Sequence, residues 1–274
     1  MKTDYKKMKT GTGIKGPINK ALDVIGRGDS YPSSFYPKSA GRILPLLNDI
    51  AKITPGRVLD VGCGVGLMAS VIAQLGFESH CLDAYKNIDE KVIRTFNLRF
   101  LECNVELSPI PYDSNSFDVV ILSEVLEHFH ANPLVPLKEI YRILKPEGLL
   151  FLTTPNVASI FSFYTLLRGD NVSTSIETVL HGGGRHPEGQ GLRLYDMHFR
   201  CYTIKEIRYL MSEVGFSIIK YKSLVRGEPS TRKFPRKLFL LLARRIAALT
   251  NSRLWGETIY IIAKKTASNT DMSC

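Results

Sequence analysis

Paired cysteines and long hydrophobic runs are both lacking in this sequence. Its 274 residues contain five cysteines, an odd number with no CxxC pair. This usage is typical of a reduced protein and argues against a disulfide framework. The first twenty residues carry six lysines against one aspartate and lack the apolar core of a signal peptide. We therefore expect a cytoplasmic protein.

Acidic residues are also in short supply. The chain has 26 Asp and Glu against 36 Lys and Arg, a formal net charge of +10. The excess favours an acidic partner: nucleic acid, an anionic membrane surface or a phosphorylated substrate. Residues 233–249 contain a basic amphipathic pattern that is too short to span a membrane. We expect either a peripheral membrane contact there or a helix whose apolar stripe packs on the domain.

The length and the 44% hydrophobic content favour one enlarged α/β domain. Residues 1–30 are rich in Lys and Gly without a sustained period, which predicts a flexible basic arm. The domain then extends over 31–265, and 266–274 form a disordered tail. A long glycine-rich stretch without periodicity predicts a lid or an acceptor-binding insertion around 156–200.

Strand and helix patterns alternate from residue 57 onward, as in βαβ units. Unbroken apolar runs predict buried parallel strands. The predicted strands are 57–61, 77–82, 100–103, 117–122, 149–153, 216–221 and 258–263. The predicted helices are 31–52, 66–75, 136–144, 156–167, 203–213 and 237–249. Thr203 and Glu206 have the spacing of a capping box, which marks the start of one of these helices.

A glycine turn follows the first predicted strand directly. It contains Asp60, Gly62, Cys63 and Gly64 in the sequence DVGCGVG and leads into a helix. Glycines leave room for a ligand to approach the backbone, and the helix N-terminus offers free N–H donors. Asp83 ends the next strand, where an acid can accept hydrogen bonds from ribose hydroxyls.

These residues resemble the Asp-x-Gly-x-Gly-x-Gly loop of class I S-adenosylmethionine-dependent methyltransferases. The similarity covers about residues 57–152 and continues through the segments LECNV, SFDVV and SEVLEH. A dinucleotide-binding loop would have its third glycine at position 67, where this chain has Leu67, so NAD is the weaker interpretation. The resemblance implies S-adenosylmethionine as cofactor. It also implies a doubly wound, seven-stranded Rossmann-like α/β sheet in the order 3-2-1-4-5-7-6, with an N-terminal arm.

The resemblance further implies which residues bind the cofactor. They follow the first four strands: Asp60, Gly62, Cys63, Gly64, Asp83, Ala84, Asn104, Val105, Ser123 and Glu124. At position 104 the family commonly has an aspartate that accepts from the adenine amino group. The amide oxygen of Asn104 can accept the same bond.

Methyl transfer is an in-line displacement that mainly requires alignment of the reactants and exclusion of water. An oxygen acceptor of high pKa also needs a base, for which His128 after the fourth strand is the candidate; the alternative is a histidine that fixes the loop. His198 lies in a segment that resembles one before a capped helix in the family. It is a candidate for the acceptor pocket or an anchor of the helix. His130, His181 and His186 lack metal-like spacing, and we expect no metal.

The segment after the fifth strand, 154–159, and the capped helix resemble methyltransferases of sugar, lipid-linked glycan and quinone pathways. This implies an enzyme (EC 2.1.1.-) that O-methylates a small-molecule, saccharide or lipid-linked acceptor. One alternative is an RNA methyltransferase that uses the basic surface, although the interleaved aromatic and basic residues of an RNA-binding module are lacking. Another is a non-catalytic cofactor-binding or scaffold protein of the same fold.

Overall fold

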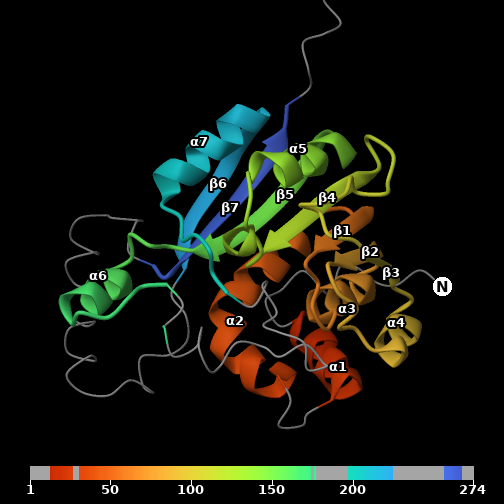
Figure 1. Ribbon diagram of the computed structural model, residues 1–274. Coiled ribbons are helices and arrows are strands. Elements are labelled where there is room, and N and C mark those ends of the chain that lie inside the picture. Colours follow the sequence, from red (N-terminus) through yellow and green to blue (C-terminus); the bar gives the residue numbers. More distant parts are fainter. Residues whose placement is uncertain (1–12, 27–30, 174–175, 177–196, 225–255, 267–274) are drawn as a thin grey trace, which may run out of the picture.

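A seven-stranded sheet with helices on both faces forms the centre of the computed structural model (Figure 1). The structure describes residues 13–26, 31–173, 176, 197–224 and 256–266. The strand order is β3-β2-β1-β4-β5-β7-β6, which confirms the predicted order and fold class. β1 to β5 run parallel, and β7 pairs antiparallel with both β5 and β6.

The strands agree with the predicted ones to within a few residues, except that β5 begins earlier. They are β1 Arg57–Val61, β2 Glu78–Asp83, β3 Arg99–Glu102, β4 Phe117–Ser123, β5 Leu144–Pro155, β6 Phe216–Leu224 and β7 Thr258–Lys265. The helices are α1 Lys15–Ile25, α2 Tyr31–Ile50, α3 Leu67–Gln74, α4 Glu90–Phe96, the short 3-10 helix η2 Leu126–His128, α5 Leu134–Ile143, α6 Ile160–Leu167 and α7 Ile204–Val214.

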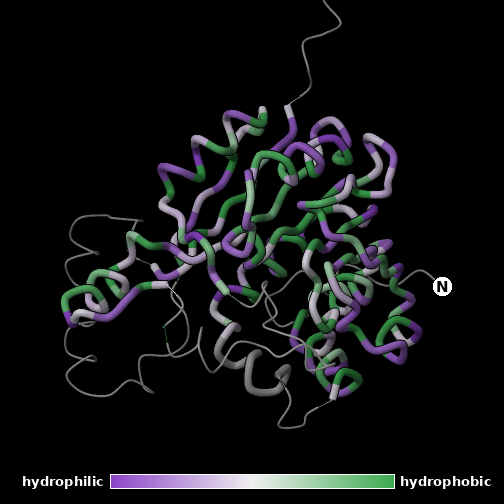
Figure 2. The backbone as a smooth tube through the Cα atoms, viewed as in Figure 1, coloured by the Kyte–Doolittle hydropathy of each residue, from purple (hydrophilic) through white to green (hydrophobic). Residues whose placement is uncertain are grey.

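Alternation along the strands produces two hydrophobic cores, one on each face of the sheet. Val58 of β1 faces the core formed with α1 to α4, whereas its neighbour Leu59 faces the core formed with α5 and α7. Hydrophobic residues accordingly run along the central strands in Figure 2. Parallel strands covered on both faces place their carboxyl ends along one common edge of the sheet.

Two predictions about the helices were wrong. Residues 15–25 of the expected flexible arm form α1, because Ile14, Ile18 and Ala21 share one face and are buried beside α3. The helix predicted from residue 156 begins only at Ile160, because Ser159 caps it by accepting from the Ser162 N–H. The capping box of Thr203 and Glu206 is confirmed at the start of α7.

Among the residues that the structure describes, no helix is long and apolar enough to cross a membrane. The predicted helix 237–249, the basic segment 233–249 and the tail 267–274 lie outside the described residues, as do most of the expected insertion around 156–200 and residues 1–12 of the arm.

Candidate functional site

The glycine turn between β1 and α3 is held against the next strand. The N–H groups of Gly62 and Cys63 both donate to the carbonyl oxygen of Leu82, at 2.8 and 3.1 Å. Gly62 and Gly64 have φ angles of +72° and +54°, in the left-handed region that glycine tolerates best. A Cβ atom at Gly62 would lie 2.4 Å from Val125 Cγ2, whereas one at Gly64 would meet nothing within 4 Å. The side chain of Val125 therefore packs directly against Gly62, whereas the space beside Gly64 contains no atom of the residues that the structure describes.

Asp83, at the end of β2, is joined directly to this turn. Its Oδ2 accepts from the Gly64 N–H at 2.8 Å, and its Oδ1 lies 3.4 Å from the Tyr85 N–H. Asp83, the expected acceptor of the ribose hydroxyls, and the glycine turn are thus bonded to each other at the carboxyl edge of the sheet. Ala84 follows immediately and is half-buried.

Asp60, the acid before the turn, is almost completely buried, with 1% of its surface exposed. Within the described residues, neither carboxylate oxygen has a hydrogen bond of normal geometry. Burial and, secondarily, repulsion from Asp83 raise the pKa of Asp60 to about 7, opposed by the backbone N–H of Ala69. The thiol of neighbouring Cys63 also has a raised pKa, because of its hydrogen bond with Cys81 and its burial.

Replacing Asp60 with asparagine is expected to stabilise the ligand-free protein at pH 8 by about 2–4 kcal/mol. The folded pKa of about 7 exceeds the ordinary value of 3.8, so the folded protein keeps a proton that the unfolded chain releases. The contribution of this carboxyl to stability is thus greatest below about pH 4 and is lost as the pH rises through 7. Thermal unfolding between pH 4.5 and 8 should show the advantage of the variant growing over that interval.

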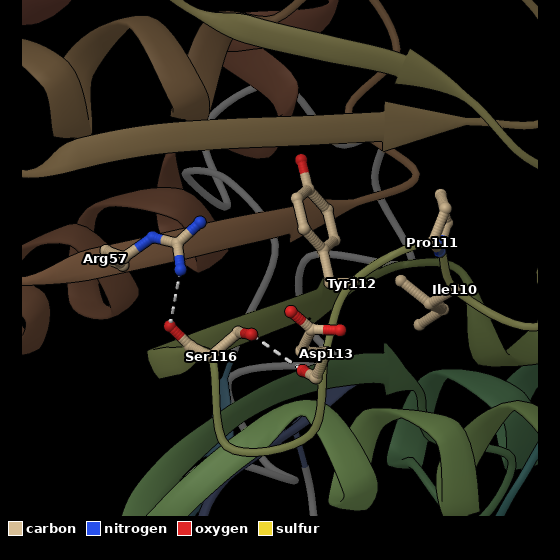
Figure 3. A pocket seen from close by; sticks show the side chains of 6 residues that line it. All are labelled: Arg57, Ile110, Pro111, Tyr112, Asp113 and Ser116. Carbon is tan, nitrogen blue, oxygen red and sulfur yellow. Dashed lines mark hydrogen bonds between the residues drawn. The ribbon is translucent and has the colours of Figure 1, made fainter.

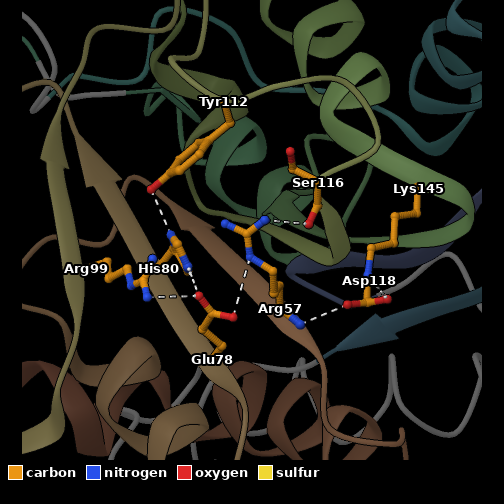
Figure 4. Close-up of polar contacts among 8 residues, drawn as sticks. All are labelled: Arg57, Glu78, His80, Arg99, Tyr112, Ser116, Asp118 and Lys145. Atoms are coloured by element: carbon orange, nitrogen blue, oxygen red, sulfur yellow. Dashed lines mark hydrogen bonds and ion pairs between the residues drawn. The ribbon is translucent and has the colours of Figure 1, made fainter.

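Asp118→Asn is the control, and it is expected to destabilise the protein at pH 8. Burial favours the neutral form of Asp118, but hydrogen bonds from Lys145 Nζ and the Arg57 N–H, both at 2.8 Å, lower its pKa overall (Figure 4). Losing this carboxylate should therefore lower the unfolding temperature at pH 8. If Asp60→Asn changed the unfolding temperature by the same amount at every pH, Asp60 could not be a buried carboxylate that is repelled by Asp83.

The expected cofactor residues after β3 and β4 lie at the same edge but make other contacts. Asn104 Oδ1 accepts from the Glu106 N–H at 3.0 Å. Ser123 Oγ lies 2.8 Å from Thr153 Oγ1 on β5. Val105, which follows Asn104, is buried in the second core.

Glu124 belongs to an ion pair that the sequence reasoning missed. It adopts a φ of +58°, and its Oε2 accepts from Arg42 Nη1 of α2 at 2.7 Å. Both side chains are largely buried, with 6% of Arg42 and 12% of Glu124 exposed. The signal in the sequence was an arginine next to Ile43 on the apolar stripe of a predicted helix. The pair ties α2 to the strand end where the expected cofactor residues lie.

Beyond β4 the structure brings two adjacent side chains together with a third that is distant in the sequence. Glu127 and His128 belong to η2, and His198 precedes α7; one potential ligand atom of each lies within 4.8 Å of the others. His198 Nε2 lies 4.0 Å from Glu127 Oε1, and the two imidazole rings meet edge to face at 4.9 Å. Sequence reasoning had selected both histidines but had missed Glu127.

Glu127 has no exposed surface, and its Oε2 accepts from Thr154 Oγ1 at 3.0 Å. Burial, followed by repulsion from Glu124, raises its pKa to about 8. The Glu127 carbonyl accepts from the N–H groups of Phe199 and Arg200, at 2.8 and 3.3 Å. These bonds fix the segment that carries His198 against η2.

A separate hollow lies at the opposite edge of the sheet, where the strands begin. Its volume is about 390 Å³, and Figure 3 shows the side chains that line it. They are Arg57, Ile110, Pro111, Tyr112, Asp113 and Ser116. Arg57 starts β1 and Ser116 directly precedes β4, so this hollow is remote from the glycine turn. Open α/β sheets bind ligands at their carboxyl edge, and we do not assign the hollow to the chemistry.

The polar residues beside the hollow pair with one another (Figure 4). His80 lies between Tyr112 Oη at 2.8 Å and Glu78 Oε1 at 3.0 Å, and Glu78 also contacts Arg57 and Arg99 at 3.6 and 3.5 Å. Burial, followed by the repulsion of the arginines, lowers the pKa of His80 in spite of Glu78, which keeps the ring neutral at pH 7. This network joins the starts of β1, β2 and β3 and has a structural role.

Comparisons with known proteins agree with this geometry. A family model described as a methyltransferase domain matches residues 36–221, more than half of the chain. The ubiquinone biosynthesis O-methyltransferase of Xanthomonas campestris pv. campestris (strain B100) is 35% identical over 111 residues, which cover 37% of this chain and 44% of that protein. The similarity thus spans less than half the length of this relative.

Two solved structures share the fold at low sequence identity. The 1,6-didemethyltoxoflavin-N1-methyltransferase of Burkholderia thailandensis, with bound 1,6-didemethyltoxoflavin and S-adenosylhomocysteine, has a TM-score of 0.56 and 15% identity, covering 90% of this chain and 88% of that chain. An S-adenosylmethionine-dependent methyltransferase from Thermotoga maritima has a TM-score of 0.54 and 18% identity, covering 85% and 94%.

Proposed function

The chain belongs to the class I family of S-adenosylmethionine-dependent methyltransferases, and from this premise we propose that it transfers the methyl group of S-adenosylmethionine to an oxygen atom of a small-molecule acceptor. The open space at Gly64, together with the carboxylate of Asp83 bonded to its N–H, supports the binding of a nucleoside there. In this arrangement Asp83 accepts from the ribose hydroxyls, and the adenine lies toward Asn104.

His128 and His198, which lie close together beyond β4, support the proposal that the methyl acceptor is an oxygen atom. The Nδ1 atom of His128 lies 3.0 Å from the carbonyl oxygen of Met197, and a carbonyl can only accept, so Nδ1 bears a proton. In the neutral ring the lone pair is then on Nε2, where it can serve to activate an acceptor hydroxyl. His128 lies just after the end of β4, and the segment that carries His198 is hydrogen-bonded to the neighbouring Glu127.

We further propose a saccharide or lipid-linked acceptor. The similarity to the Xanthomonas relative, an O-methyltransferase of ubiquinone biosynthesis, favours oxygen as the acceptor atom. The exposed side chains Phe163, Leu166 and Leu167 of α6, at 55%, 57% and 65% of their surface, favour an acceptor with an apolar portion. Figure 1 shows α6 extending beside the end of the sheet where β5 leads into it.

Two measurements on the purified protein test the proposal. Calorimetric titration with S-adenosylmethionine, S-adenosylhomocysteine and NAD should show saturable binding of the first two and none of the third. Transfer of a radiolabelled methyl group should then be measured with quinone-type phenols, saccharides, lipid-linked saccharides, amines and transfer RNA. Labelled RNA or amine would contradict an oxygen acceptor in a small molecule, and no label in any class despite cofactor binding would favour a non-catalytic protein.

His128→Ala is expected to lower kcat by roughly 10²–10⁴ and to leave the affinity for S-adenosylhomocysteine within about twofold. The reason is that His128 acts on the acceptor, whereas the expected cofactor residues lie at the ends of β1 to β4 and extend only to Glu124. His130→Ala is the matched control, because His130 follows two positions later and its side chain pairs with Glu106 at 3.2 Å. Equal loss of cofactor binding and of turnover in His128→Ala would show that His128 supports the fold of the site and not the acceptor.

A further inference from the structure

Glu127, His128 and His198 combine the side-chain types that hold divalent transition metals. One carboxylate and two imidazoles form the ligand set of many open metal sites, in which the remaining positions take water or substrate. Here the three potential ligand atoms lie within 4.8 Å of one another. The ligand atoms of one tetrahedral ion lie about 3.4 Å apart, since each metal–nitrogen bond is about 2.1 Å long. Side-chain movements of roughly 1.4 Å in total would bring the longest separation to that value.

The carboxylate of Glu127 is only half satisfied by the protein. Its Oε2 accepts from Thr154 Oγ1, while its Oε1 is buried and has no hydrogen-bond partner among the described residues. It is Oε1 that faces His198 Nε2 at 4.0 Å. A buried carboxylate oxygen without a partner is unfavourable, and a cation between these two atoms would compensate it.

His128 is oriented as metal-binding histidines usually are. Such residues donate the proton of one ring nitrogen to a carbonyl or carboxylate, which fixes the other nitrogen as the ligand. The Nδ1 proton of His128 meets the Met197 carbonyl oxygen at 3.0 Å, leaving the Nε2 lone pair. Met197 directly precedes His198, so a single turn of chain orients one candidate ligand and supplies another.

We propose that Glu127, His128 and His198 form a binding site for one divalent transition-metal ion, with positions left open toward the acceptor. The site is defined by this geometry alone. Its use in catalysis rests on the proposed function: an acceptor hydroxyl on the open position would lose its proton to solvent more readily, and the Nε2 lone pair of His128 would then bind the metal instead of accepting that proton itself.

Cobalt(II) titration of the metal-stripped full-length chain tests the proposal. Binding of one ion per chain should give visible absorption bands without the thiolate charge-transfer bands expected if the cysteines were the ligands. Glu127→Gln and His198→Ala should each weaken binding at least tenfold. Glutamine keeps an oxygen for Thr154, and the unfolding temperature of each variant shows whether the fold is retained.

Two controls cover three of the four other histidines of the chain. His130→Ala and the double variant His181→Ala/His186→Ala should bind cobalt as the wild type does. The proposal is overturned if wild-type protein binds no cobalt in the micromolar range, if the controls weaken binding as much as His198→Ala, or if thiolate bands appear. S-adenosylhomocysteine binding is titrated in the same metal-stripped samples, so that failure of the metal site and failure of the proposed cofactor function are seen separately.

Discussion

Asp83→Ala is expected to reduce the affinity for S-adenosylhomocysteine about a hundredfold. A carboxylate that accepts from two ribose hydroxyls makes charge-assisted bonds worth about 1.5–3 kcal/mol each, and 2.8 kcal/mol corresponds to a factor of a hundred. The substitution also removes the acceptor of the Gly64 N–H, which leaves the turn less well positioned. Calorimetry on the ligand-free protein measures the effect.

The fold should survive this change. Asp83 is partly exposed, and its removal relieves the repulsion that acts on buried Asp60. Asp113→Ala is the control, since Asp113 is an exposed acid at the opposite edge of the sheet. A threefold or smaller loss of affinity in Asp83→Ala, with Asp113→Ala unchanged, would show that the ribose is bound elsewhere.

Most of the sheet could be predicted because its signals are local. The central strands β1 and β4 and the second half of β5 contain short apolar runs. The capping box at Thr203 and Glu206 marks the start of α7 without reference to the rest of the chain. α4 was missed because it has only seven residues, with Asp89 as its cap and Asn97 at its end. α1 was missed because its stability depends on α3, a partner distant in sequence.

In the candidate site, too, the residues that are close in sequence could be predicted, whereas contacts between distant segments could not. The glycine turn is continuous in sequence, so its residues could be named, and Asp83 was found because it ends the following strand. The contact of Glu127 with His198 depends on a parallel bridge between Asn156 and Tyr202, which brings the segment before α7 to η2. The spacing of these residues along the chain does not indicate that bridge, which is why the sequence analysis did not select Glu127.

Gly62→Ala is expected to destabilise the fold and Gly64→Ala to weaken cofactor binding, although both residues belong to the same turn. At Gly62 the new Cβ would lie 2.4 Å from Val125 Cγ2 on a backbone with φ +72°. Overpacking and left-handed strain together should destabilise the protein by about 3 kcal/mol or more. The unfolding temperature should then fall by roughly 6–12 °C.

At Gly64 the new Cβ meets open space, so the loss is only the strain of a left-handed alanine, about 1 kcal/mol. This variant should fold and yet bind S-adenosylhomocysteine at least tenfold more weakly, because the methyl group occupies the space proposed for the cofactor. Binding within twofold of wild type would place the nucleoside away from this turn.

Val125→Ala provides the decisive comparison. It removes Cγ2, the atom that the Gly62→Ala methyl group would strike, while Val125 Cβ would lie 3.5 Å away, an ordinary contact. The double variant Gly62→Ala/Val125→Ala should therefore unfold at a higher temperature than Gly62→Ala alone, even though Val125→Ala by itself removes packing. Val125→Ala should not restore cofactor binding to Gly64→Ala, because there the obstruction involves the ligand and not the protein. If Val125→Ala raised the unfolding temperature of Gly62→Ala and also restored cofactor binding to Gly64→Ala, or did neither, the two glycine variants would not differ in the way proposed here.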